Sequence, residues 1–273
     1  MRLINLRPDR GARVLLAALP FVLLAAAYLI GSAARLAENP ADKLLPSLAS
    51  MAQMVGAYAF TPDRRTGDYL LWTDTAASLF RLWAGLAIAT AIALVLGLLT
   101  GVLPVARAML APFVAFLSMV PPLALLPILF IALGLGETSK IALIVIGVAP
   151  IMTRDLALAV AALPREQIVK AETLSASSWL ITLRIVLPQV MPRLLDSLRL
   201  QLGPAFLFLI AAEAISSESG LGYRIFLVRR YLSMDVIFPY VLWITLLAVA
   251  MDLALRLLRR RLAPWAEPEG ARP

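Results

Sequence analysis

The sequence predicts an all-α integral membrane protein with about six transmembrane helices. Of its 273 residues, 61% are apolar and only 15% are charged, whereas soluble domains are typically about 45–50% apolar and about 25% charged. One soluble core could not bury this excess, because surface area grows too quickly with chain length. Six apolar runs approach the roughly 20 residues that cross a bilayer, so lipid is the expected solvent.

The composition also excludes several chemistries. The chain contains no cysteine and no histidine, which removes disulfides, thiolate catalysis and the commonest general base and metal ligand. Its net charge of +8 would indicate nucleic acid as the partner of a soluble protein. Here the basic residues gather at the ends of apolar runs, as they do on the cytoplasmic side of membrane proteins. We therefore expect no nucleic-acid partner, no metal site and no catalytic site in this chain.

The first expected span covers about residues 14–36. Its apolar run of about 23 residues exceeds the roughly 7–15 of a signal peptide, so we expect a retained helix. The segment before it carries four arginines, Arg2, Arg7, Arg10 and Arg13. Residues 37–74 form the longest polar interval, within which 44–60 is mildly amphipathic and predicts a helix at the interface. We assign residues 1–74 to a cytoplasmic segment, the first span and a long periplasmic loop.

Five further apolar runs complete the expected bundle. They cover about residues 75–101, 109–133, 140–163, 189–215 and 237–258. Prolines inside these runs remove backbone donors and kink the helices; they are Pro121, Pro122, Pro127, Pro150 and Pro204. Abundant alanine, glycine and serine permit close helix packing. We expect a bent, packed core over 75–265, followed by a cytoplasmic tail over 266–273.

The distribution of basic residues predicts the orientation. In a six-span chain, the two termini and the connection between the fourth and fifth spans lie on one side. That connection carries Arg165, Lys170 and Arg184, and the carboxyl end carries Arg256, Arg259, Arg260, Arg261 and Arg272. Arg224, Arg229 and Arg230 lie on the other side. Because most of these basic residues lie on the side of the termini, the positive-inside rule predicts that both termini are cytoplasmic.

The connection from Pro164 to Pro188 is too polar at its start to cross a membrane and too apolar to be a plain loop. Trp179, Leu183 and Leu187 recur at helical spacing and predict one apolar face. The serines over 175–178 supply a break and candidate N-caps. The pattern predicts a cytoplasmic helix–turn–helix, and an interfacial hairpin that rests on the bilayer explains it equally well.

This segment resembles the EAA loop of binding-protein-dependent ABC importer permeases. The pattern of that loop is E-A-A, three residues, glycine, nine residues and I-x-L-P. Residues 185–188 match its end, and Ala171 matches the third place of E-A-A. Ser175 stands at the glycine position, while Val169 and Lys170 replace the glutamate and the first alanine.

The resemblance extends over about residues 75–265, where the chain looks like the nitrate/sulfonate/taurine branch of this family. The segments that carry it are Ser78–Arg81 with Gly85, Met119–Pro127, Gly134–Glu137, Ala211–Glu213, Ser219–Tyr223, Asp252 and Pro264–Trp265. It implies a type I ABC importer permease fold, with six transmembrane helices and a cytoplasmic coupling helix, in the bacterial inner membrane. The implied function is a translocation path for a small polar solute.

The resemblance also implies partners: a second permease copy in a homodimer, two ATP-binding cassette ATPases and a periplasmic solute-binding protein. ATP and Mg²⁺ would bind the ATPase, since this chain has no G-x-x-x-x-G-K-[ST] motif. The resemblance assigns coupling to the ATPase to Ala171, Thr173, Leu174, Ser175, Ala176, Ile185, Leu187 and Pro188.

Ionisable residues inside membrane spans are functional candidates. Glu213 follows a long apolar run and either lines the path or hydrogen-bonds the outer loops, with the arginines at 224, 229 and 230 as possible partners. Arg154 and Asp155 lie inside the fourth span and are further path candidates.

Other charged residues favour structural roles. Asp252 and Arg256 are spaced for an i,i+4 pair. Arg193, Asp196 and Arg199 lie at the inner end of the fifth span, and we expect them to support the coupling loop.

Two other functional classes compete with a permease subunit. An ion-coupled secondary transporter would favour internal inverted repeats, and none is evident in the sequence. A membrane enzyme would need catalytic groups, and the chain lacks histidine, cysteine and any clustered carboxylate motif.

Overall fold

The computed structural model describes residues 9–40 and 42–266, and every regular element within them is helical. Four helices are long and apolar enough to cross a membrane: α1 (Arg10–Glu38), α3 (Leu70–Val102), α6 (Glu137–Ala161) and α12 (Met234–Leu262). Two bent helix pairs bring the number to six when each pair counts as one span. The predicted all-α membrane fold is thereby confirmed.

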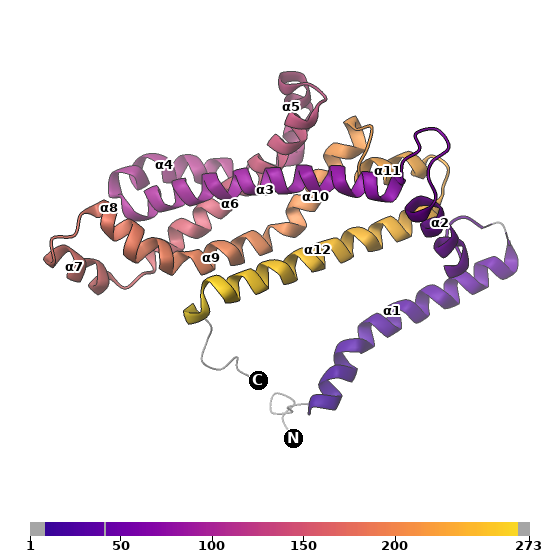
Figure 1. Cartoon of the computed structure of the whole chain (residues 1–273), viewed down its shortest axis with the longest axis horizontal. Coiled ribbons are helices and arrows are strands. Elements are labelled where there is room, and N and C mark those ends of the chain that lie inside the picture. The colour runs from indigo at the N-terminus through magenta and orange to yellow at the C-terminus, as the bar shows by residue number, and fades with distance from the viewer. Residues whose placement is uncertain (1–8, 41, 267–273) are drawn as a thin grey trace.

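The first bent pair corresponds to the third expected span. It consists of α4 (Pro104–Leu117) and the short η2 (Pro122–Leu125) with α5 (Leu126–Leu133), and the two arms meet at 81°. The break lies at the expected prolines, because Pro121 precedes η2 and Pro122 begins it. As a result, α5 projects sideways from the bundle (Figure 1), with Ile131 87% exposed.

The second bent pair corresponds to the fifth expected span. Its first arm runs through α8 (Ser178–Ile181), the π-helical turn η3 (Thr182–Val186) and α9 (Leu187–Leu200). It meets α10 (Leu202–Ser216) at 42°. Pro204 lies in the first turn of α10, where a missing N–H costs little. By contrast, α6 continues through Pro150 without a break.

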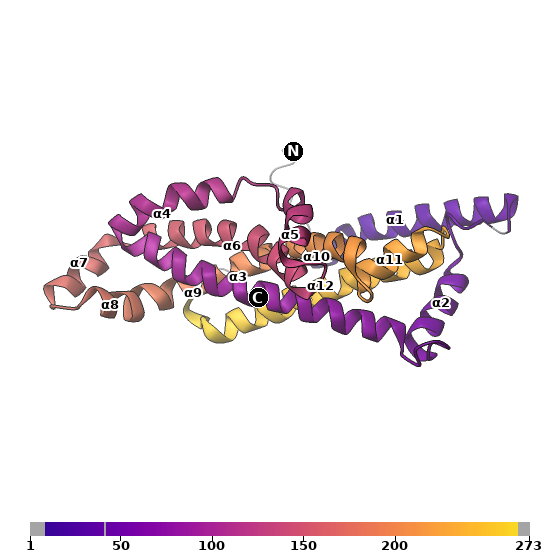
Figure 2. The ribbon, with the colours of Figure 1, turned by 90° about the horizontal axis from the view of Figure 1, so that it is seen from above.

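Three shorter helices lie at the two ends of the bundle: α2 (Leu48–Phe60), α7 (Arg165–Thr173) and α11 (Leu221–Arg229). The short η4 (Pro264–Ala266) follows α12. In Figures 1 and 2, α7 and α8 lie at one end of the long axis, and α2 and α11 lie at the other. We call these the α7 end and the α11 end. α1 stands apart from the bundle (Figure 1), and its most apolar window has no buried residue.

Small residues on α3 allow α6 to approach closely. They recur at every fourth position, as Gly85, Ala89, Ala93, Gly97 and Gly101, and all are buried. A Cβ added to any of the three glycines would lie 2.5–2.8 Å from a side chain of α6. This is the small-residue packing expected of membrane helices, and it makes α3 and α6 the centre of the bundle.

Some boundaries differ from the sequence expectation. α3 begins at Leu70, five residues before the expected start at about residue 75. α2 begins at Leu48 because the Ser47 hydroxyl caps it by accepting the Ser50 N–H at 3.1 Å. Arg2, Arg7, Arg272 and all but the first residue of the expected tail lie outside the described residues.

Candidate functional site

A polar face of α3 organises the α11 end. Asp74, Ser78 and Arg81 are four and three residues apart, so they lie on one side of the helix. Their exposed fractions are 0%, 0% and 4%. Buried charges are strongly destabilising unless paired and hydrogen-bonded, so this face needs polar partners from other helices.

Arg81 binds two carboxylates at once. Its Nη1 donates to Glu213 Oε1 at 2.6 Å and to the carbonyl oxygen of Ser219 at 2.8 Å. Its Nε and Nη2 both bond Glu137, the Nη2 bond being 2.9 Å long. Lys140 Nζ also reaches Glu137, at 3.1 Å. The guanidinium therefore connects α3 to the start of α6, to α10 and to the turn before α11.

The first turn of α11 is anchored by the same groups. The N–H groups of residues 220, 221 and 222 donate, in that order, to Asp74 Oδ1 at 2.9 Å, to Ser78 Oγ at 2.8 Å and to Glu213 Oε2 at 2.8 Å. Helix N-termini leave such donors unsatisfied and favour negative charge. The Ser78 hydroxyl in turn donates to Glu213, so every polar group named here is satisfied.

Two glycines make this arrangement possible. Gly220 has φ +131°, and a Cβ there would lie 2.5 Å from Glu213 Cδ and 2.7 Å from Arg81 Nη1. A Cβ on Gly222 would lie 2.7 Å from the carbonyl oxygen of Ile210. Any side chain at either position would push the carboxylate or the backbone away, which explains the Gly-x-Gly spacing.

Asp74 forms a further ion pair of the network, with Arg224. Arg224 Nε donates to Asp74 Oδ2 at 2.8 Å, and the Tyr240 hydroxyl donates to the same oxygen at 3.1 Å. Burial alone would lower the pKa of Arg224, but the hydrogen bond and charge of Asp74 outweigh it and raise that pKa. α3, α11 and α12 are thereby joined. We call Asp74, Ser78, Arg81, Glu137, Lys140, Glu213, Arg224 and Tyr240 the α11-end network.

The expected partners of Glu213 need correction. The sequence suggested Arg224, Arg229 or Arg230, but Glu213 pairs with Arg81 and Arg224 pairs with Asp74. Sequence reasoning missed that Asp74, Ser78 and Arg81 lie on one face of α3. A helix start at about residue 75 left Asp74 outside the helix, so the face was not evident.

The α7 end contains the expected helix–turn–helix. α7 ends in a Schellman turn, in which the Ser175 N–H donates to the Glu172 carbonyl at 2.9 Å and the Ala176 N–H to the Ala171 carbonyl at 3.0 Å. Ser175 has φ +60°, a left-handed conformation that favours glycine. This explains why the EAA pattern has glycine at that position. The expected N-cap is also present, because Ser177 Oγ accepts the N–H of Leu180 at 3.3 Å.

The eight residues expected to couple to the ATPase do not all lie at this turn. Thr173, Leu174 and Ser175 are exposed there, Ala176 is half-buried, and Ala171 is only 8% exposed. Ile185, Leu187 and Pro188 lie on the π-helical turn and the start of α9, which run back into the bundle.

The two adjacent path candidates on α6 have different surroundings. Asp155 Oδ2 accepts a hydrogen bond from Arg193 Nε at 3.0 Å, which ties α6 to α9. Arg154 Nη1 donates to Ser118 Oγ at 2.7 Å, and Arg154 lines a groove between α3, α4 and α6.

The expected pair of Asp252 and Arg256 is confirmed, and Asp196 and Arg199 of α9 join it. Arg256 bonds Asp252 at 2.8 Å, and Arg199 bonds Asp196 at 3.1 Å. They belong to one cluster, because Arg199 also bonds Asp252 at 2.8 Å and Arg259 lies 3.1 Å from Asp196. The cluster joins α9 to α12, the last expected span.

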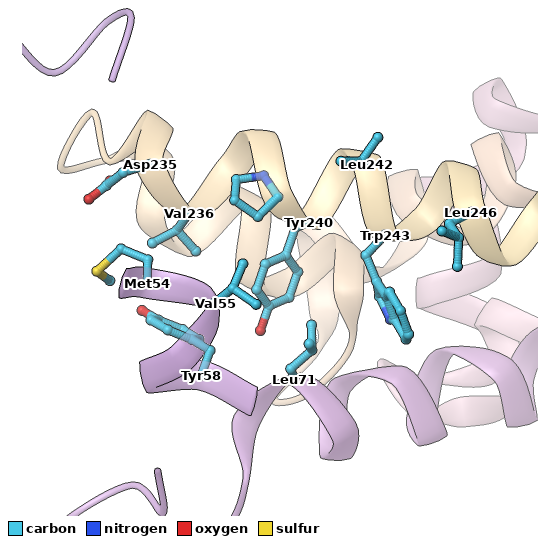
Figure 3. A pocket seen from close by; sticks show the side chains of 11 residues that line it. Met54, Val55, Tyr58, Leu71, Asp235, Val236, Tyr240, Leu242, Trp243 and Leu246 are labelled. Carbon is cyan, nitrogen blue, oxygen red and sulfur yellow. The ribbon is translucent and has the colours of Figure 1, made fainter. Parts of the chain in front are cut away.

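An apolar pocket of about 190 Å³ lies between α2, the start of α3 and α12 (Figure 3). The rings of Tyr58 and Tyr240 meet edge to face there, with centroids 6.0 Å apart. Leu71 and Trp243 also line it, and among the described residues of its lining only Asp235 is charged. This lining suits an apolar group better than a polar solute.

Comparisons with known proteins agree with this architecture. Residues 93–266 match the family described as binding-protein-dependent transport system inner membrane component. The taurine transport system permease protein TauC of Escherichia coli is 37% identical over 199 residues, 72% of each chain. The bicarbonate transport system permease protein CmpB of Synechococcus elongatus is 34% identical over 165 residues, 60% of this chain and 59% of that protein.

Among solved structures, a chain of the inward-facing MetNI methionine ABC transporter superposes with a TM-score of 0.63. The superposition covers 73% of this chain and 99% of that chain. At 18% identity, this likeness describes the fold alone.

Proposed function

The chain belongs to the family of binding-protein-dependent transport system inner membrane components, and we propose from this premise that its cargo is a small oxyanion. The chain itself is a membrane-embedded permease subunit of an ABC importer. The family match carries this conclusion, because it spans both bent helix pairs and the α7–α8 turn. The relatives that transport taurine and bicarbonate support the substrate class, because a sulfonate and a bicarbonate both present anionic oxygens.

The test of this function is uptake by the reconstituted complex. The permease, its ATPase and its binding protein are placed in proteoliposomes, and uptake of labelled taurine or bicarbonate is measured. We expect uptake to require ATP and the binding protein. Uptake driven by an ion gradient without the ATPase would support a secondary transporter instead.

We further propose that two copies of this chain form the path, with two ATPases that bind ATP and Mg²⁺ and one binding protein. The exposed arm α5 supports a second copy, since Ile128 and Ile131 are 60% and 87% exposed on a helix that projects from the bundle (Figure 1). Cross-linking of Ile131→Cys between two chains would test the dimer, because the natural chain has no cysteine.

We propose that the turn between α7 and α8 docks on the ATPase. Leu174 and Trp179 are 76% and 71% exposed there, which leaves apolar surface for a partner. Ser175→Glu should abolish coupling between ATP hydrolysis and uptake without preventing membrane insertion. Thr66→Glu, an equal charge change in an exposed turn at the other end, serves as the control. Unchanged coupling in the Ser175 variant would leave an interfacial hairpin as the better interpretation.

We propose that Glu213 positions the α11-end network rather than lining the path. Its support is complete burial and three hydrogen-bond donors, Ser78 Oγ, Arg81 Nη1 and Gly222 N, which together reach both carboxylate oxygens. Glu213→Gln should therefore reduce the yield of assembled complex. A path residue would instead lose transport with assembly and basal ATP hydrolysis intact, and wild-type assembly together with wild-type transport would contradict both roles.

We propose that both termini are cytoplasmic, so that the α7 end faces the cytoplasm and the α11 end the periplasm. Single cysteines in place of Leu174 and Asp63 test this with a membrane-impermeant thiol reagent. Leu174→Cys should react from the cytoplasm and Asp63→Cys from the outside. The reverse result would invert the orientation.

A further inference from the structure

Two arginines that line one groove of the bundle, Arg107 and Arg154, have no carboxylate partner among the described residues. Seven basic side chains of α3, α6, α9, α11 and α12 form ion pairs: Arg81, Lys140, Arg193, Arg199, Arg224, Arg256 and Arg259. Arg107 and Arg154 form no ion pair with any residue of 9–40 or 42–266. Their charges are therefore not neutralised within the described part of the chain.

The hydrogen bonds of these two arginines involve neutral groups. Arg107 Nε donates to the carbonyl oxygen of Thr100 at 2.9 Å, and its Nη2 to that of Gly101 at 2.6 Å. Arg154 Nη1 donates to Ser118 Oγ at 2.7 Å. These contacts orient both guanidinium groups. Within the described part of the chain, Nη1 of Arg107 and Nε and Nη2 of Arg154 have no hydrogen-bond acceptor, so they can donate to a ligand.

Both arginines line the same groove. It measures about 310 Å³ and lies between the end of α3, α4 and α6, and none of the described residues that line it is acidic. Thr100 and Thr153 also line it, but their hydroxyls donate to backbone carbonyls of their own helices, so the two guanidinium groups are its charged donors. Small residues such as Ala157 complete the lining. The nearest acidic residue in sequence, Asp155, is bonded to Arg193 of α9 and does not line the groove.

The depth of Arg154 makes a purely lipid-facing position unfavourable. It lies seven residues before Ala161, the last residue of α6. At about 1.5 Å per residue, this places Arg154 about 10 Å from the end of the helix. Unpaired charges at such depth are rare unless they face water, a partner or an ion pathway. The groove therefore needs water or an anion.

We propose that this groove binds a small oxyanion, of the sulfonate or carbonate class, on its way through the permease. The proposal rests on the proposed function, and it names the residues that would receive the cargo. A guanidinium matches two oxygens of such an anion with parallel N–H donors. Arg154 and Arg107 would hold it from α6 and α4, so the anion supplies the missing negative charge.

Thiol labelling of the assembled complex tests the groove directly. Ala157→Cys gives a single cysteine in the groove, since the natural chain has none. In nanodiscs of a zwitterionic phospholipid, it is exposed to a methanethiosulfonate with an ethylsulfonate group and to one with an ethyltrimethylammonium group. After correction for intrinsic reactivity, we expect the anionic reagent to react on the order of 10-fold faster, because two positive charges lie nearby.

Two comparisons sharpen this test. Arg154→Gln together with Arg107→Gln should abolish the preference for the anionic reagent, whereas Arg229→Gln, an exposed arginine of α11, should retain it. Ethanesulfonate at millimolar concentration should slow the anionic reagent and leave an exposed control cysteine at Thr66 unaffected. Both results would support an anion site.

Three outcomes would overturn the proposal. Failure of both reagents to react would mean that the groove faces lipid. An equal rate for both reagents would mean that the arginines do not attract anions there. A preference that resists ethanesulfonate but disappears when phosphatidylglycerol is added would assign the site to a lipid headgroup. None of these readouts depends on transport, so loss of ATP-driven uptake rejects the proposed function separately.

Discussion

The two ends of the bundle differ in where their polar and exposed groups find partners. At the α11 end, Glu213 and Arg81 are 0% and 4% exposed and satisfy each other. At the α7 end, Leu174 and Trp179 are 76% and 71% exposed, and backbone hydrogen bonds hold the turn. The α11 end is stabilised by contacts within the chain, whereas the α7 end leaves apolar side chains exposed.

This difference also explains where the EAA pattern is lost. Val169 and Lys170, which replace its first two residues, are exposed, while the matching Ala171 is 8% exposed. Exposed positions tolerate substitution because no neighbour within the chain has to move. Ala171, which matches the pattern, is the residue of the three that packs into the core.

The largest expected effect is the loss of Arg81. Arg81→Ala leaves Glu213 as an uncompensated buried charge, which costs about 3–5 kcal/mol. Thermal unfolding of the purified permease in detergent would measure it as a lower midpoint. Arg229→Ala, an exposed arginine of α11, should unfold like the natural chain. Equal midpoints for the two variants would contradict the network's importance.

A side chain at Gly220 should have the next largest effect. Gly220→Ala forces a left-handed non-glycine residue against Glu213 and Arg81, with a cost of about 1–3 kcal/mol. The matched control is Gly203→Ala, because a Cβ there meets no atom within 4 Å. The same unfolding measurement compares the two variants, and a Gly220 variant as stable as the control would show that the turn can relax.

At the α7 end we expect a change of opposite sign. Ser175→Gly removes the penalty of a left-handed serine and should stabilise the turn by about 1 kcal/mol. Amide hydrogen exchange over residues 171–177 should slow, and Ser175→Val should accelerate it. Exchange that is indifferent to both substitutions would mean that the turn does not hold this conformation in solution.

The smallest expected effect is the loss of the α8 cap. Ser177→Ala removes the acceptor for the Leu180 N–H and should cost about 0.5 kcal/mol, since the bond is long and exposed. Hydrogen exchange of Leu180 is the measurement. Ser178→Ala changes the neighbouring hydroxyl without removing the cap, so similar exchange in both variants would argue against capping.

Much of the fold follows from local sequence. Apolar runs of sufficient length predict membrane helices anywhere in a chain, and the run over residues 237–258 lies within α12 (Met234–Leu262). Pro121 and Pro122 predict the break between α4 and α5 because proline lacks an N–H donor. The serine turn and I-x-L-P end between Pro164 and Pro188 likewise predict the α7–α8 connection.

The sequence alone determined that the chain enters a membrane, where its helices run and which family it resembles, because these depend on composition and short spacing. Only the tertiary structure decided which charges meet. Arg81 and Glu213 are 132 residues apart, and Asp74 and Arg224 are 150 apart. Several arginines were equally available to Glu213 by charge. The packing of α3 against α6, α10 and α11 brings one of them within hydrogen-bonding distance, and burial makes that pairing necessary.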